Sequence, residues 1–247
     1  MFDNSKLKIK RAQEHIDELN RLIDFFIKTD FCAISSETDP KTGSYTLSFS
    51  VTKSLPDDIA LVIGDAVHNL RGALDLLLYE IIADESTHFP FYPDRESLVA
   101  SKRYRFIEKA APEVARYIAD TVKPYETGNR ALWGLHRLDI IDKHHLLIPT
   151  LQVTGITIFD AVANNNVVIK DQHIAIEGIG RINAIRGPGK LHIKSYGKPE
   201  ISILFGPETP FHGQPVLEVL IMRVVDIQKI VTAFEKAGFG RRSTIKT

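Results

Sequence analysis

The chain has 247 residues, of which 44% are hydrophobic and 25% are charged, a composition that predicts a folded protein and excludes a disordered one. Its 31 Lys and Arg residues balance 31 Asp and Glu residues, so overall charge does not favour a nucleic-acid or membrane partner. Cys32 is the sole cysteine, which excludes an intrachain disulfide and a cysteine-based zinc site. The charged N-terminal residues do not resemble a signal peptide and the apolar runs are too short to span a bilayer, so we expect a cytoplasmic protein without a membrane partner.

The first half of the chain is predicted to be mainly helical. Residues 4–29 carry apolar side chains at alternating steps of three and four, which indicates one amphipathic helix. A turn at 39–43 precedes an alternating strand at 45–51. The next helix is expected to start at Ser54, with Asp57 completing a capping box, and to run to about Ile81.

The proline-containing segment 87–94 is predicted to be extended, and 96–122 to be helical with a new segment starting at Pro112. A second polar helix is expected at about 132–145. Short β-branched runs between residues 146 and 222, Val216–Met222 among them, alternate with Asn, Gly and Pro and predict an antiparallel sheet.

A final helix is expected at 226–237, ending at Gly238, before a basic tail with Arg241, Arg242 and Lys246. We therefore expect an α+β fold with two parts packed as one compact unit. Residues 1–145 form a mainly helical part with a strand near 45–52, and residues 146–247 form a β-rich segment plus the C-terminal helix.

The helix at 64–80 carries polar residues on the side opposite its apolar stripe. A helical wheel places Asp65, His68 and Asp75 together there, beside leucine and tyrosine side chains. A face of this mixed character indicates packing against a second element or subunit, and Gly72 on the same face is expected to permit close approach.

The spacing of these polar residues allows two interpretations. Asp65 and His68 are three apart and Arg71 and Asp75 are four apart, which predicts two local ion pairs on the helix. Alternatively, His68, Asn69 and Arg71 form part of a ligand-binding or active-site surface.

The second polar helix carries three further features. Asp142 lies near the core stripe, where a carboxylate needs a partner from the first helix, a backbone cap or a proton. His136, Asp139 and Lys143 share one line along the helix, and Arg137 and His144 share another, about two turns apart.

Metal-assisted chemistry is one functional class to weigh. His136 and Asp139 are three residues apart and could chelate a metal together with His68 or His144. The chain has no HExxH sequence and no pair of histidines four residues apart, so we expect neither a metal site nor a cofactor.

The segment Arg137-Leu-Asp-Ile-Ile-Asp-Lys-His144 places six residues between an Arg and a His near a helix C-terminus. It resembles the Arg-x(4–6)-His motif of the HEPN superfamily, helical proteins that include dimeric ribonucleases. The resemblance implies that Arg137 and His144 act together at a dimer cleft, Arg on the phosphate charge and His in proton transfer. It also implies that the segment 146–222 is an addition to the helical domain.

The stretch Ile63–Asp75, with the sequence IGDAVHNLRGALD, and the later LDIIDKH of Leu138–His144 resemble a group of uncharacterised bacterial and phage proteins over about residues 5–150. Members of that group often carry a His at the position of Leu76, which forms an Arg-x(4)-His with the equivalent of Arg71. Because this chain lacks that His, the resemblance directs a catalytic role toward Arg137 and His144.

Two functional hypotheses follow. The first is an RNA-directed, HEPN-like homodimer with Arg137 and His144 as catalytic residues. The second is a non-catalytic binding or scaffold protein whose polar helices form an interface. The residues expected to bind a ligand or partner are His68, Asn69, Arg71, Asp75, Asp139, Asp142 and Lys143.

Overall fold

The computed structural model describes residues 1–163, 167–178 and 180–240, and its fold class is α+β, as predicted. The contacts divide the chain into two compact units. Of the described residues, the helical unit comprises 1–19, 60–147 and 206–240, and the β unit comprises 20–59, 148–163, 167–178 and 180–205. The predicted boundary after residue 145 lies beside one of these divisions, but both units also contain residues from other parts of the chain. The predicted basic tail lies outside the described residues.

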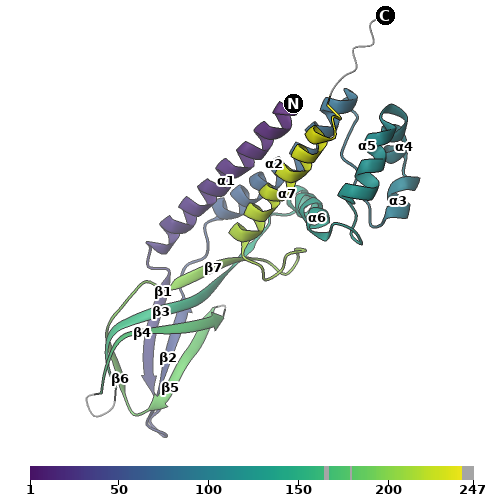
Figure 1. Ribbon diagram of the computed structural model, residues 1–247. Helices are drawn as coiled ribbons and strands as arrows, with labels where there is room; N and C mark the ends of the chain where they lie inside the picture. Colours follow the sequence, from purple (N-terminus) through teal and green to yellow (C-terminus); the bar gives the residue numbers. More distant parts are fainter. Residues whose placement is uncertain (164–166, 179, 241–247) are drawn as a thin grey trace, which may run out of the picture. The chain divides into compact units, whose positions relative to one another are not determined.

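Helices account for the first unit (Figure 1). The helices are α1 (Asp3–Ile27), α2 (Asp57–Ile82), α3 (Arg95–Ala100), α4 (Lys102–Ala110), α5 (Pro112–Tyr117), the π-helical segment η1 (Ile118–Val122), α6 (Arg130–His144) and α7 (Val216–Lys236). Residues 20–27 of α1 and 57–59 of α2 are counted with the β unit. The N-terminal part of α1 lies beside α2 and α7. The Ser5 hydroxyl donates a buried hydrogen bond to the Ala73 carbonyl, and Lys6 forms an ion pair with Glu235.

Two antiparallel sheets form the β unit. The strands are β1 (Cys32–Thr38), β2 (Ser44–Val51), β3 (Pro149–Ala163), β4 (Val167–Gly178), β5 (Arg181–Pro188), β6 (Leu191–Tyr196) and β7 (Glu200–Phe205). One sheet has the order β1-β2-β5, and in the other β3 pairs with β4 on one edge and with β6 and β7 on the other. Buried residues of β2, β3 and β4, such as Leu47, Val153 and Ile176, form the common core of the unit.

Most of the predicted elements agree with the structure, and two do not. Val216–Met222 was expected as a strand but is the first part of α7. Its buried residues recur at helical steps, as Val216, Val219, Leu220, Arg223 and Val224, and this spacing continues into the rest of the helix. The helix expected to start at Ser54 begins at Asp57, since Pro56 disfavours a helical backbone at the residue before it. Strand β1 was not predicted because its side chains lack a buried alternating face.

Gly64 of α2 lies directly against the Asp142 side chain of α6. A Cβ atom added there would lie 2.6 Å from the Asp142 Cγ, which is far inside van der Waals contact. Gly72, where the sequence suggested close approach, has more room, because its added Cβ would meet only the Lys8 Cε at 3.9 Å. Within the described chain the close contact of this helix therefore lies two turns earlier, at Gly64, and close approach of a second subunit at Gly72 stays a prediction.

Gly64→Ala is predicted to destabilise the protein by about 1–3 kcal/mol, because Asp142 or the α6 backbone must move. The matched control is Gly72→Ala in the same helix, which is predicted to stabilise by about 0.5–1 kcal/mol through helix propensity alone. Chemical denaturation of both variants measures the difference. Equal effects of the two substitutions would contradict a steric role for Gly64.

Candidate functional site

Helix α6 presents a polar group to the interior of the helical unit. The Asn129 side chain caps the helix by accepting a hydrogen bond from the Leu132 amide at 3.0 Å. Leu135 and Leu138 are fully buried, and Asp139 is nearly so, with 2% of its surface exposed. We call the residues that α2 and α6 contribute around this point the α2–α6 cluster. They are His68, Asn69, Arg71, Asp75, His136, Asp139, Asp142 and Lys143.

The carboxylate of Asp139 accepts two hydrogen bonds, one on each oxygen. Its Oδ1 lies 3.2 Å from the His68 Nδ1, and its Oδ2 accepts from the Lys143 Nζ at 2.6 Å. A buried carboxylate is tolerated only when it is paired and hydrogen-bonded, and both conditions are met here. Lys143 is four residues from Asp139 on the predicted line, whereas His68 reaches it from α2.

The His68–Asp139 pair has the arrangement of a proton-transfer dyad. An ionised carboxylate only accepts hydrogen bonds, so the neutral imidazole carries its proton on Nδ1, and Nε2 is left as an acceptor. The His68 side chain is 57% exposed while that of Asp139 is 3% exposed. The orienting acid is therefore inside the protein and the ring it holds faces solvent.

Two other carboxylates, those of Asp65 and Asp142, differ from what the sequence predicted. Within the described part of the chain His68 pairs with Asp139 and not with Asp65, so the predicted pair of Asp65 and His68 was wrong. Asp142 is half-buried against Gly64, and it is Asp139 that occupies the fully buried position. Burial raises the pKa of Asp142, and the negative charges of Asp139 and Asp65 raise it further.

Arg71 is 6% exposed, and its guanidinium is fully engaged in bonds within the helical unit. It donates to the Asp75 carboxylate at 2.6 Å, which confirms the predicted ion pair, and to the Phe89 carbonyl at 3.1 Å. Its Nε lies 3.4 Å from the His136 Nδ1, and its Cζ lies 4.6 Å above the Phe91 ring. These contacts fasten the extended segment at 88–91 to both helices.

His136 is enclosed by aromatic rings. It stacks on Phe91 with 4.3 Å between ring centroids, and the Trp133 ring lies 5.6 Å away on a tilt. Burial lowers the pKa of His136 to about 4, and the neighbouring positive charge of Arg71 contributes. A neutral ring is consistent with its Nδ1 accepting from Arg71.

Asn69 has a separate role, since it joins α2 to α1. Its side-chain oxygen accepts from the Lys8 Nζ at 3.0 Å, and its amide nitrogen donates to the Asp65 carbonyl at 2.8 Å. Lys8 was not singled out from the sequence, and neither were Phe89, Phe91 and Gly64. The aromatic residues of the proline-containing segment were the one sequence signal that could have identified part of this packing.

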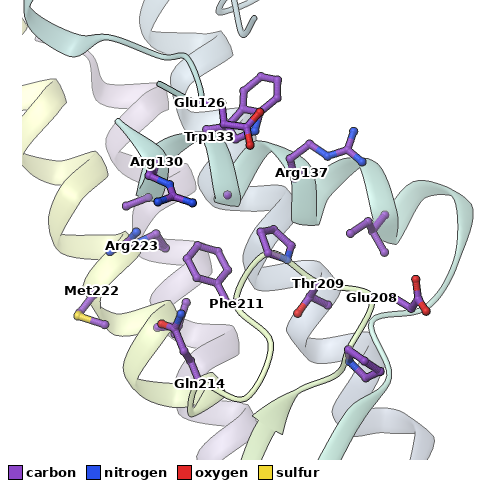
Figure 2. Close-up of a pocket in the computed structure, with 16 residues that line it drawn as sticks. Glu126, Arg130, Trp133, Arg137, Glu208, Thr209, Phe211, Gln214, Met222 and Arg223 are labelled. Carbon is purple, nitrogen blue, oxygen red and sulfur yellow. The ribbon is translucent and has the colours of Figure 1, made fainter. Parts of the chain in front are cut away.

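Neither Arg137 nor His144 forms a hydrogen bond or an ion pair with the α2–α6 cluster in the described part of the chain. Arg137 is exposed and lines a cavity of about 970 Å³ on the other side of α6, formed with the loop before α7 and with α7 itself (Figure 2). His144 is exposed in the last turn of α6 and is not among the residues that line this cavity. No hydrogen bond joins the two side chains in the described chain.

Two global features bear on the hypotheses. Among residues 1–163, 167–178 and 180–240, no three His, Cys, Asp or Glu side chains gather as a metal site would require. No helix in that part of the chain combines the length and apolar character needed to cross a bilayer.

Comparisons with protein-family models, curated proteins and solved structures found no match to this chain.

The stability of the protein is predicted to fall as the pH drops from 6.5 to about 4, in part through His136. In the unfolded chain this ring binds a proton below about pH 6.5, whereas in the folded protein it does so only near 4. Its contribution is therefore complete above pH 6.5 and is lost across that window. His136→Asn keeps an acceptor for Arg71 but does not titrate, so its free energy of unfolding should fall less steeply.

Urea denaturation at several pH values measures this difference. Trp133→Phe is the control, because it alters a neighbour of the same ring without removing the titrating group. Parallel pH curves for wild type and His136→Asn would contradict a lowered pKa for His136.

Proposed function

We propose that the protein is RNA-directed and that His68, oriented by Asp139, transfers protons at an RNA phosphodiester. The single observation that supports this proposal is the hydrogen bond from an exposed imidazole to a buried carboxylate. Such a pair fixes the tautomer and the orientation of the ring, which is what a general base needs. The RNA substrate itself comes from the resemblance of the helical part to HEPN ribonucleases.

In this proposal the nucleophile belongs to the substrate. The His68 Nε2 accepts the proton of a ribose 2′-hydroxyl, whose oxygen attacks the adjacent phosphorus while the bond from phosphorus to the 5′-oxygen breaks. The leaving 5′-oxygen takes the proton that His68 has accepted, which returns the ring to its neutral form, and a 2′,3′-cyclic phosphate remains. Lys143 forms an ion pair with the other oxygen of Asp139, and half of its side chain is exposed. In this proposal its positive charge, beside His68, attracts the phosphate.

The Arg-x(4–6)-His resemblance assigns the same chemistry to Arg137 and His144. Seven residues of helix place these two about 10 Å apart along α6, on the same side of the helix. In the family the two residues act at a dimer cleft, so a catalytic role for this pair requires a second copy. The exposed apolar residues Ile221, Met222 and Val225 of α7 support association into a homodimer.

The second candidate is a non-catalytic binding or scaffold protein. Arg71 supports it, because each of its hydrogen bonds is made within the helical unit and its charge is neutralised by Asp75. Under this hypothesis the cluster is structural, and its role is to hold α2, α6 and the segment 88–91 together.

The proposal predicts that purified protein cleaves a labelled single-stranded RNA and that His68→Ala lowers the rate by about 100-fold or more. Asp139→Asn should also lower it, because the ring loses its preferred tautomer. His192→Ala is the matched control, since His192 is an exposed histidine of the β unit. Gel electrophoresis of the products and sedimentation velocity on the same samples measure rate and oligomeric state.

The pattern of variants separates the hypotheses. Loss of cleavage in Arg137→Ala and His144→Ala, with His68→Ala active, would move the chemistry to the Arg137–His144 pair. Wild-type protein without cleavage of any RNA tested would favour the scaffold hypothesis. Thermal unfolding of each variant separates lost chemistry from lost folding.

A further inference from the structure

The cavity that Arg137 lines is bounded on one side by tightly packed residues. Phe211, from the loop between β7 and α7, lies against Gly134 of α6, where an added Cβ would come within 2.5 Å of the ring. The Arg223 guanidinium of α7 lies 5.7 Å from the centroid of the same ring. Figure 2 shows Phe211 between the two helices, with Arg130 reaching toward it from α6 and Arg223 from α7.

Arg223 is the unusual member of this lining. It is 8% exposed, and although it forms an ion pair with Asp226 at 2.9 Å, its Nε has no hydrogen-bond partner among the described residues. A buried donor without a partner costs about 1–3 kcal/mol, so an acceptor that fills the position is stabilising. Burial also lowers the pKa of Arg223, which is the direction expected for a charge that lacks full compensation.

The other cations of the cavity are also arginines. Arg130 and Arg137 are exposed and form no ion pair within the described chain. None of the described residues that line the cavity is a lysine. Glu126 and Glu208 contribute negative charge, but both are exposed, where water and salt weaken their effect. Guanidinium groups bind phosphate with two parallel hydrogen bonds, which distinguishes them from the point charge of lysine.

The remaining lining fits more than an inorganic ion. A volume of about 970 Å³ lies at the upper end of the range for small-molecule sites. Trp133 offers an aromatic surface at the cavity, and Gln214 and Thr209 offer hydrogen-bonding groups. A planar heterocycle uses both kinds of contact, by stacking and by hydrogen bonds at its edge.

We propose that this cavity binds a phosphate-bearing ligand of nucleotide size, with Arg223 and Arg130 on the phosphate and Trp133 beside the base. The site is distinct from the α2–α6 cluster, which lies on the opposite side of α6, and the inference does not depend on RNA cleavage. The ligand is either a free nucleotide or one nucleotide of an RNA chain.

Fluorescence of Trp133 tests the proposal, because this residue is the sole tryptophan of the chain and lines the cavity. Uridine monophosphate should change its emission saturably, and inorganic phosphate should compete at higher concentration. Arg223→Met and Arg130→Gln should each weaken binding about tenfold or more, through loss of a charged hydrogen bond. Arg103→Gln, at an exposed arginine of α4, is the control and should bind as wild type does.

A single-stranded RNA octamer distinguishes the two sources of the ligand. Tighter binding of the octamer than of the monophosphate identifies an RNA chain, and equal or weaker binding identifies a free nucleotide. The same titration in His68→Ala should be unchanged, so that the cavity is tested whether or not the protein cleaves RNA.

Two results would overturn the proposal. One is the lack of any saturable change with uridine monophosphate. The other is that Arg130→Gln binds uridine monophosphate as tightly as wild type does. Arg130 is exposed, and circular dichroism can check that its variant folds, so this test holds even if Arg223→Met fails to fold.

Discussion

The hydrogen bonds of one buried carboxylate determine how the polar residues of α2 and α6 are arranged. Asp139 is buried on α6 together with two apolar residues, Leu135 one turn earlier and Leu138 directly before it. Because a buried negative charge is costly unless it is compensated, both of its oxygens need donors. His68 supplies one from α2, and Lys143 supplies the other from the same helix. This hydrogen bond orients the His68 ring, and the proposed chemistry depends on that orientation.

Helix α6 thus has two polar sides with different physical characters. Toward α2 its charges are compensated inside the protein, as Asp139 is by His68 and Lys143. Toward α7 the arginines face a cavity, and Arg223 retains a buried donor that the described chain does not satisfy. The first side suits proton transfer by an oriented imidazole, and the second suits the binding of an anion. Trp133 lies between them, since it lines the cavity and also contacts His136 of the cluster.

Local features of this arrangement could be predicted from the sequence, and long-range ones could not. Helical spacing predicted the α+β class, the extent of α1 and α6, and the pair of Arg71 with Asp75, because residues three or four apart on a helix are neighbours. The same rule paired His68 with Asp65, whereas the observed partner is Asp139, 71 residues away. A helical wheel gives positions within one helix but not which face meets another helix. For that reason the contact of Gly64 with Asp142 was not predicted. The start of α7 was taken as a strand because its β-branched residues favour strands.

The most direct test of the role of Asp139 is the tautomer of His68 in the neutral imidazole form. Two-dimensional ¹⁵N NMR at about pH 9, where histidines are neutral, distinguishes a protonated from an unprotonated ring nitrogen. The account predicts a proton on Nδ1 of His68 in the wild-type protein, and its partial or complete transfer to Nε2 in Asp139→Asn. A wild-type ring with its proton on Nε2, or an Asp139→Asn variant with an unchanged spectrum, would contradict an Asp139 carboxylate that orients His68.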